Sequence, residues 1–339
     1  MFQNAKRSLS RRAFVAATVG AAAGGLVRPS RGYAAPIGKL EKPDLKVGAS
    51  VTGASFMPVY VAVDHTWKPN GIDGELFSFR GDAELAQALV GDSVDVACIS
   101  CDALVSLIDA HAACTGFYCG FYTAAFAWVS KPSIKSWNEV KGTSVAITTY
   151  GSMTDIFARY MMTKHGIEPL KDVKIVQGGP PAAMLQLLKA GRTQAALLAP
   201  PYIAIAKEEG FTVLGTEAGE IASQWPNEVF VAKTKFIDEN PNTLKALLRA
   251  HVASIRLSKK DPSVAIDALI HRLKITPPIA KATYDVIMPS LDERGHLPDK
   301  TNMDVFWAVE KKNGKVTEPW PNSKLLDDRF IKSFASWAP

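Results

Sequence analysis

Four cysteines are the residues of this sequence best suited to binding a metal or forming a disulfide, and they fall in two close pairs. Cys98 and Cys101 form the first pair, and Cys114 and Cys119 form the second. Such spacing occurs in zinc sites. Residues 94–99, however, form a short apolar segment typical of a buried strand, where Cys98 cannot easily turn to share a metal with Cys101. Because buried cysteine commonly packs as a small apolar residue, we expect no metal site. One disulfide, in an oxidising compartment, and free buried thiols remain as alternatives.

Other catalytic motifs are missing from the sequence. The six histidines are scattered along the chain, and no nucleophile elbow, phosphate-binding loop or zinc-protease motif occurs. We therefore expect no catalytic residue, no cofactor and no enzymatic activity.

Small polar and aromatic residues gather instead in four loops, each of which follows a predicted strand. In open α/β sheets, ligands bind beyond the carboxyl ends of the strands. The candidate ligand-binding residues are Gly53, Ala54, Ser55, Phe56, Ser100, Cys101, Thr149, Tyr150, Gly151, Ser152, Pro200 and Tyr202. The N–H groups of a helix N-terminus suit a carboxylate or sulfonate, and Gly151 would let the backbone approach a ligand closely. Ser and Thr also cap helices where no ligand binds, so both interpretations stay open.

Strands and helices alternate along the chain in two similar groups. The predicted strands are residues 45–51, 74–79 and 94–99 in the first group, and 142–147, 173–177 and 195–198 in the second. In both groups a helix ends at a glycine, Gly91 or Gly191, and a short apolar strand follows. This alternation predicts an α/β fold with a largely parallel sheet, and its repetition predicts two lobes that face each other. From about Asn227 onward the pattern is mostly helical, with amphipathic helices predicted at 241–257 and 262–273.

Positive charge is concentrated at the N-terminus. Residues 1–35 hold six of the 39 basic residues and none of the 33 acidic ones, so the remaining 33 basic residues balance the acidic ones. The formal net charge of +6 therefore does not indicate nucleic-acid binding.

The N-terminal segment has the pattern of an export signal. A soft apolar stretch, residues 13–27, follows the paired Arg11 and Arg12, and small residues precede a cleavage position near Ala34 or Ala35. The paired arginines resemble a twin-arginine signal, with an ordinary secretory signal as the alternative. We expect cleavage of residues 1–35 and export to the periplasm. No later apolar run is long enough to span a membrane.

The order of several short motifs resembles the sulfonate/taurine/nitrate-type substrate-binding proteins of ABC importers, which are related to the thiamine-pyrimidine synthases and binding proteins. The motifs are Lys46-Val47-Gly48, Asn70-Gly71-Ile72-Asp73, Phe79-Arg80-Gly81-Asp82-Ala83, Gln87-Ala88-Leu89-Val90-Gly91, Val94-Asp95-Val96-Ala97, Glu139-Val140-Lys141-Gly142, Tyr150-Gly151-Ser152-Met153-Thr154-Asp155, Gly178-Gly179-Pro180-Pro181 and Pro200-Pro201-Tyr202. The resemblance covers roughly residues 44–260. Gln194, where the family more often has Asp, and the added Pro201 depart from the pattern.

This resemblance implies an α/β, two-lobed type II periplasmic binding protein fold with a hinge. We expect the first lobe at 44–124 plus 226–339 and the second at 125–225. The implied function is to bind a small organic, anionic solute such as a sulfonate or carboxylate between the lobes. The implied partners are an importer permease with its ATPase, with the protein itself a monomer.

Three other functions on the same fold stay open. One is a binding protein for a pyrimidine or thiamine precursor, and another is a synthase-like enzyme, which would need a lysine and a histidine in the cleft; His65 is the nearest candidate. A ligand sensor that docks to a receptor is the third.

Overall fold

The computed structural model describes residues 37–122 and 125–339. The predicted export signal lies outside the described residues.

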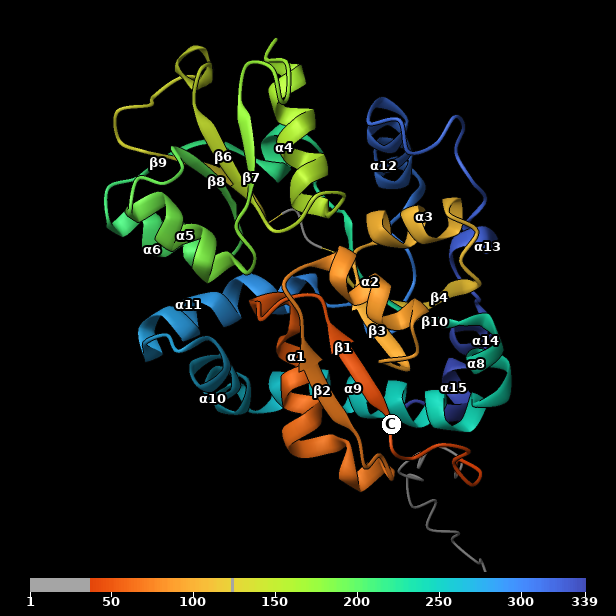
Figure 1. The fold of residues 1–339 in the computed structure, drawn as a ribbon. Helices are drawn as coiled ribbons and strands as arrows, with labels where there is room; N and C mark the ends of the chain where they lie inside the picture. Colours follow the sequence, from red (N-terminus) through yellow and green to blue (C-terminus); the bar gives the residue numbers. More distant parts are fainter. Residues whose placement is uncertain (1–36, 123–124) are drawn as a thin grey trace, which may run out of the picture. The chain divides into compact units, whose positions relative to one another are not determined.

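The first sheet has five strands in the order β2-β1-β3-β10-β4 (Figure 1). The strands are β1 (Lys46–Ala49), β2 (Glu75–Ser78), β3 (Val96–Ile99), β4 (Cys114–Tyr122) and β10 (Pro226–Lys233). β1 pairs in parallel with β2 and β3, whereas β10 runs antiparallel to both β3 and β4. The sheet is therefore mixed rather than largely parallel. Apart from β10, which includes Asn227, the described elements from that residue onward are helices, so the expected mostly helical pattern is confirmed.

The second sheet repeats this plan in the order β7-β6-β8-β5-β9. Its strands are β5 (Ala127–Ser130), β6 (Ser144–Ile147), β7 (Lys174–Gln177), β8 (Ala195–Leu198) and β9 (Thr212–Thr216). β6 pairs in parallel with β7 and β8, and β5 runs antiparallel to β8 and β9. The two groups of elements in the sequence thus form two similar sheets, and the predicted α/β fold class is confirmed.

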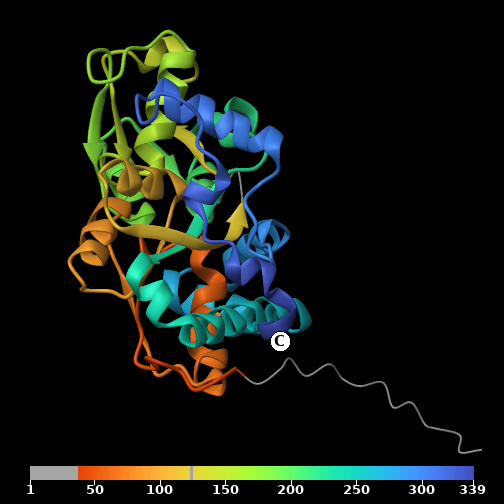
Figure 2. The same ribbon diagram turned by 90° about the vertical axis from the view of Figure 1, so that its right-hand side faces the viewer.

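The helices fall into two groups along the chain. Those before β10 are α1 (Met57–Val61), α2 (Asp82–Val90), α3 (Cys101–Asp109), α4 (Met153–Lys164), α5 (Pro181–Lys189), α6 (Tyr202–Glu208) and α7 (Glu217–Glu220). Those after β10 are α8 (Thr234–Glu239), α9 (Pro241–Lys260), α10 (Pro262–Leu273), α11 (Pro277–Ile287), α12 (Lys300–Lys312), α13 (Asn322–Leu325), α14 (Arg329–Lys332) and α15 (Phe334–Trp337). Several begin with proline, which suits the first turn because that turn leaves its N–H groups unpaired. The long α9 lies beside the C-terminal helices (Figure 2), where the Arg249 guanidinium donates to the Trp337 carbonyl.

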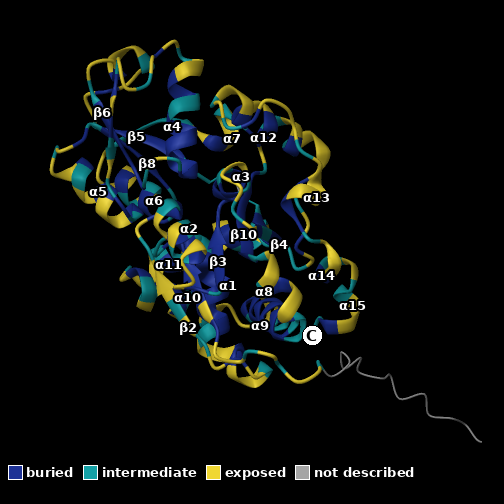
Figure 3. Ribbon diagram, turned by 45° about the vertical axis from the view of Figure 1, so that its right-hand side comes forward, coloured by how far each residue is buried: buried dark blue, intermediate teal, exposed yellow. Residues whose placement is uncertain are grey.

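Alternate side chains of the strands enter different cores, as the two-residue period of a strand requires. In β3, Val96 and Cys98 pack toward α1, α9 and α10, whereas Ala97 and Ile99 pack toward α2 and α3. In the second sheet, Val145 and its neighbours share a core with α4, and the opposite face packs on α5 and α6. The inner strands β3, β5, β6, β8 and β10 are accordingly dark blue, that is buried, in Figure 3, whereas the edge strands β2, β7 and β9 are largely exposed or half-buried.

One core is continuous between the two sheets. It contains Ile99 of the first sheet and Ile147 of the second, together with residues of α3, α4 and α12. The Trp225 ring lies 4.9 Å from that of Phe157 on α4 and 5.0 Å from that of Phe306 on α12, measured between centroids. These three aromatic rings join the second sheet, the segment before β10 and the C-terminal part of the chain.

Candidate functional site

A pocket lies at the carboxyl ends of strands from both sheets. Its empty volume is about 660 Å³, a figure that includes the opening to solvent. Its lining comprises Ser50, Val51, Gly53, Ala54, Ser55, Phe56, Gly81, Asp82, Ser100, Phe121, Ala125, Phe126, Thr148, Met153, Thr154, Pro181, Ala199, Pro200, Asn227 and Ile287. Hydroxyl groups, small residues and three phenylalanines dominate this surface.

Six of the twelve residues proposed from the sequence line this pocket. They are Gly53, Ala54, Ser55, Phe56, Ser100 and Pro200. The loop after β1 is held in place by the Gly53 N–H, which donates to the Tyr60 hydroxyl at 3.1 Å. That hydroxyl is buried, and burial raises its pKa far above the usual range, so it stays protonated.

Asp82 is the one ionisable group among the described residues that line the pocket. Asp82 is the first residue of α2, and Gly81 occupies the cap position before it. The Asp82 carboxylate accepts from the Ser100 N–H at 3.3 Å and from the Ser100 hydroxyl at 3.0 Å. Desolvation raises the pKa of Asp82, and these hydrogen bonds oppose the rise.

Three hydroxyls form a compact cluster on the second-sheet side of the pocket. Thr148 donates to Ser152 at 2.8 Å, and the Thr154 hydroxyl lies 2.9 Å from those of both Thr148 and Ser152. Thr148 and Thr154 line the pocket, whereas Ser152 is 1% exposed and does not. Ser152 occupies the cap position of α4 without a side-chain cap hydrogen bond.

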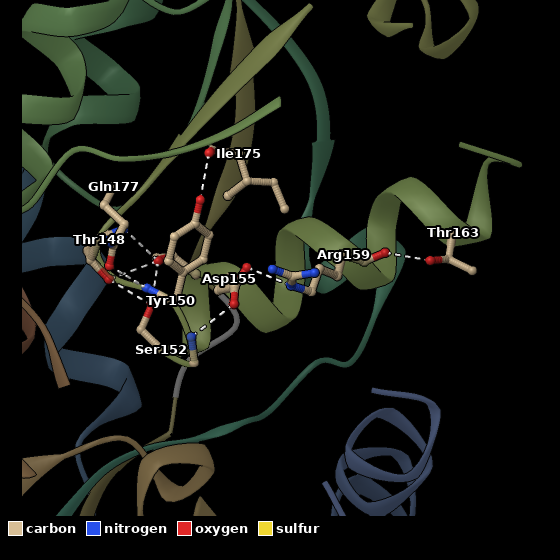
Figure 4. Close-up of polar contacts among 10 residues, drawn as sticks. Thr148, Tyr150, Ser152, Asp155, Arg159, Thr163, Ile175 and Gln177 are labelled. Atoms are coloured by element: carbon tan, nitrogen blue, oxygen red, sulfur yellow. Dashed lines mark hydrogen bonds and ion pairs between the residues drawn. The ribbon is translucent and has the colours of Figure 1, made fainter. Parts of the chain in front are cut away.

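Tyr150 and Gly151, expected to bind ligand, lie outside the pocket lining and are held by contacts within the second sheet and α4 (Figure 4). The Tyr150 hydroxyl donates to the Ile175 carbonyl at 2.9 Å, and the Gly151 N–H donates to Asp155 at 2.9 Å. Gly151 has φ +76°, a left-handed backbone conformation that favours glycine. A Cβ at residue 151 would face Lys315 rather than the pocket.

The other three proposed residues are also absent from the lining. Cys101 begins α3 and is fully buried in the core that joins the sheets. Tyr202 begins α6 and packs in the core of the second sheet. Thr149 packs against Gly81 of the first-sheet side, where a Cβ at residue 81 would lie 2.5 Å from the Thr149 Oγ1. Thr149 therefore forms a steric contact between the two sides.

The residues that sequence reasoning missed are mostly neighbours of those it proposed. Thr148 directly precedes the proposed 149–152 segment, and Thr154, the second residue of α4, lies two residues after it. Phe121, Asn227 and Ile287 come from β4, β10 and α11, elements that the sequence pattern did not reveal. Only the apolar character of β4 could have indicated that strand.

Two buried carboxyl groups lie beside the site on α3 and α12. The Trp225 indole N–H donates to the Asp102 Oδ2 at 3.0 Å. Glu310 is also fully buried. Burial is the main cause that raises the pKa of both groups, and their mutual repulsion raises that of Glu310 further.

All four cysteines are free and buried in the described structure. Within residues 37–122 and 125–339, no group of three or more His, Cys, Asp or Glu side chains is arranged to hold a metal ion. The described helices include none that is both long enough and apolar enough to cross a membrane.

Comparison with known proteins agrees with this geometry. Residues 125–269 match the NMT1-like family. The chain is 21% identical over 310 residues to a putative binding protein, YtlA, of Bacillus subtilis, which covers 86% of this chain and 90% of YtlA. It is also 28% identical over 120 residues to the nitrate/nitrite binding protein NrtA of a Nostoc species, but this match spans 35% of the chain and only 27% of NrtA.

Solved structures show the same fold. The periplasmic aliphatic sulphonate binding protein SsuA of Escherichia coli has a TM-score of 0.63 at 15% identity, over 84% of this chain and 92% of SsuA. The periplasmic nitrate-binding protein NrtA of Synechocystis has a TM-score of 0.59 at 16% identity, over 87% of this chain and 86% of NrtA. The resemblance to the nitrate- and sulfonate-type substrate-binding proteins is therefore confirmed, and the chain has their two-lobed periplasmic binding protein fold.

Proposed function

We propose that this protein is the solute-binding component of an ABC-type importer and binds a small organic solute in the pocket between its two sheets. The observation that carries the proposal is that the lining comes from both sheets: Ser55 and Ser100 from one side, and Thr148 and Thr154 from the other. A solute that contacts both sides binds best when they are together, so binding shifts the protein toward a closed form.

The residues that line the pocket support a binding function more than a catalytic one. None of the described residues that line the pocket is a lysine or histidine, which a synthase-like enzyme would need. His65, the candidate for that chemistry, is exposed and lies outside the lining. The relatives reported above are likewise named as binding proteins.

The test is to purify the native protein, identify the co-purified solute by mass spectrometry, and measure how far that solute raises the melting temperature. Ser55→Phe, which fills the pocket, should abolish the increase. Ser93→Phe is the matched control, because residue 93 is exposed and outside the pocket. Equal stabilisation of both variants by the solute would show that the pocket has been placed wrongly.

The division into lobes is part of the same proposal. We assign residues 44–124 and 226–339 to one lobe and 125–225 to the other, a division supported by the strand membership of the two sheets. Addition of the solute should reduce the radius of gyration in small-angle X-ray scattering. A radius unchanged at saturating solute would contradict closure.

The proposed cellular setting is the periplasm, reached through the twin-arginine route, with an importer permease and its ATPase as partners of a monomeric protein. Support comes from the Arg11-Arg12 pair and from the periplasmic relatives. Replacing both arginines with lysine should leave the precursor in the cytoplasm, whereas a control with Arg28 and Arg31 replaced should be exported. Normal export of the Arg11→Lys/Arg12→Lys variant would exclude this route.

A further inference from the structure

The N-terminus of α3, which could hold an anion, already binds a carboxylate of the protein. The Asp82 carboxylate accepts from both the N–H and the hydroxyl of Ser100, which caps α3. Asp82 also lines the pocket, so an anion that enters the pocket comes close to this carboxylate.

An anionic solute would therefore find little positive charge in this pocket. Asp82 is 6% exposed, so its charge is poorly screened by solvent. No lysine, arginine or histidine is found among the described lining residues to offset it. Ser100, the N-cap residue of α3 at one of the helix N-termini that the sequence suggested for a sulfonate or carboxylate, is hydrogen-bonded to Asp82 instead.

Two polar side chains in the lining remain available for a solute. Asn227 is 8% exposed, and neither its amide nor the Ser55 hydroxyl makes a hydrogen bond to another of the described residues. An amide and a hydroxyl each donate and accept, which suits an uncharged polar group. Phe56, Phe121 and Phe126 supply apolar surface around them.

We infer that the pocket selects solutes without a negative charge, that Asp82 is the residue that excludes anions, and that Asn227 and Ser55 bind an uncharged polar group of the solute. This inference rests on the proposed function and narrows it, because it replaces the anionic solute expected from the sequence.

The experiment uses three probes of nearly equal shape: benzoate, benzamide and benzamidinium, which differ in charge. Calorimetric titration of the full protein should give a dissociation constant for benzamide at least about tenfold lower than that for benzoate. Asp82→Asn, which keeps the shape of the side chain and removes its charge, should reduce this ratio by about tenfold.

Two further variants separate charge from hydrogen bonding. Ser100→Ala removes the hydroxyl that donates to Asp82 but leaves the Asp82 carboxyl, so the ratio should stay high. Asn227→Ala should weaken benzamide binding without improving benzoate binding. Melting curves of each variant show that it is folded.

The outcomes distinguish this inference from the proposed function. Wild-type protein that binds benzoate as tightly as benzamide, or Asp82→Asn protein with an unchanged ratio, would overturn the inference. If the wild-type protein binds none of the probes, the charge of the co-purified solute tests the inference instead. An anionic co-purified solute would overturn the inference. Only the absence of any bound solute would count against the proposed function itself.

Discussion

At the scale of single residues, Gly81 is the pocket-lining glycine that packs most closely against the other side. A Cβ at residue 81 would lie 2.5 Å from the Oγ1 and 2.7 Å from the Cγ2 of Thr149. The backbone at Gly81 is extended, with φ 166°, and tolerates any residue. Gly81→Ala should therefore leave the unfolding free energy nearly unchanged but weaken binding of the co-purified solute by about 1–3 kcal/mol, since the two sides cannot meet fully. Isothermal titration and melting curves measure the two effects separately.

Thr149 provides the control for this prediction. Thr149→Ala removes both of the atoms nearest to the new Cβ, so the double variant Gly81→Ala/Thr149→Ala should recover much of the lost affinity. If the double variant binds as poorly as Gly81→Ala alone, the loss arises elsewhere.

Ser152 and Gly151 should affect stability rather than solute contact, contrary to the expectation from the sequence. Ser152→Ala removes buried hydrogen bonds to Thr148 and Thr154 and should lower the unfolding free energy by about 1–2 kcal/mol. Gly151→Ala forces a side chain into a left-handed conformation and should cost about 1 kcal/mol. Urea denaturation checks both values, with the exposed Ser93→Ala as the unchanged control. A large loss of solute affinity at unchanged stability would contradict this assignment.

At the scale of elements, β3, α3 and β4 keep all four thiols out of solvent. Burial raises the pKa of each cysteine, most clearly of Cys98 and Cys101. Because the thiolate is the reactive form, iodoacetamide at pH 8 should leave the native protein unlabelled and label four cysteines in guanidinium chloride. Mass spectrometry counts the labels. Fewer than four after denaturation without reductant would indicate a disulfide.

The contact between α3 and α12 should make stability depend on pH. Burial raises the pKa of Asp102 and Glu310 above that of an unfolded carboxyl group, so the folded pair holds a proton that the unfolded chain releases. The unfolding free energy contributed by this pair should therefore be highest near pH 4 and fall as pH rises through neutrality. Glu310→Gln should flatten this slope in urea denaturation between pH 4 and 9.

Glu318→Gln is the matched control on the surface, where Glu318 pairs with Lys311 and is mostly exposed. It should leave the slope unchanged. A Glu310→Gln variant with the wild-type slope would show that the pair carries a charge on both carboxyl groups in the folded state.

At the scale of the whole molecule, the shared core should make the two sheets unfold together. The aromatic contacts of Trp225 with Phe157 and Phe306 lie within this core. Phe306→Ala should cost about 3–5 kcal/mol and lower the melting temperature of both sheets equally. Circular dichroism and tryptophan fluorescence should give one coincident transition for the wild type. Two separate transitions in the wild-type protein would contradict this coupling.

The sequence predicted those parts of the fold that have a regular local pattern. The strand at 195–198 and the helix at 262–273 match the structure residue for residue. The antiparallel strands β5, β9 and β10 escaped prediction, because their pairing depends on partners distant in the chain rather than on local periodicity. The site residues were proposed from the loops that follow the parallel strands, and half of the proposed residues line the pocket. The role of Asp82 could not be read from sequence, since it depends on hydrogen bonds from Ser100, which follows a different strand.

The position of β10 between β3 and β4 also bears on the order in which the protein folds. β3 and β4 follow each other closely in the chain, yet each pairs with β10, about a hundred residues later. The second sheet, by contrast, is complete within residues 127–216. Long-range pairing is slow because distant segments must first meet. The second sheet can therefore assemble as soon as its own residues are available. The first sheet cannot pair β3 and β4 fully until β10 inserts between them. In pulsed hydrogen exchange, amides of β6 and β8 should gain protection before those of β3 and β4.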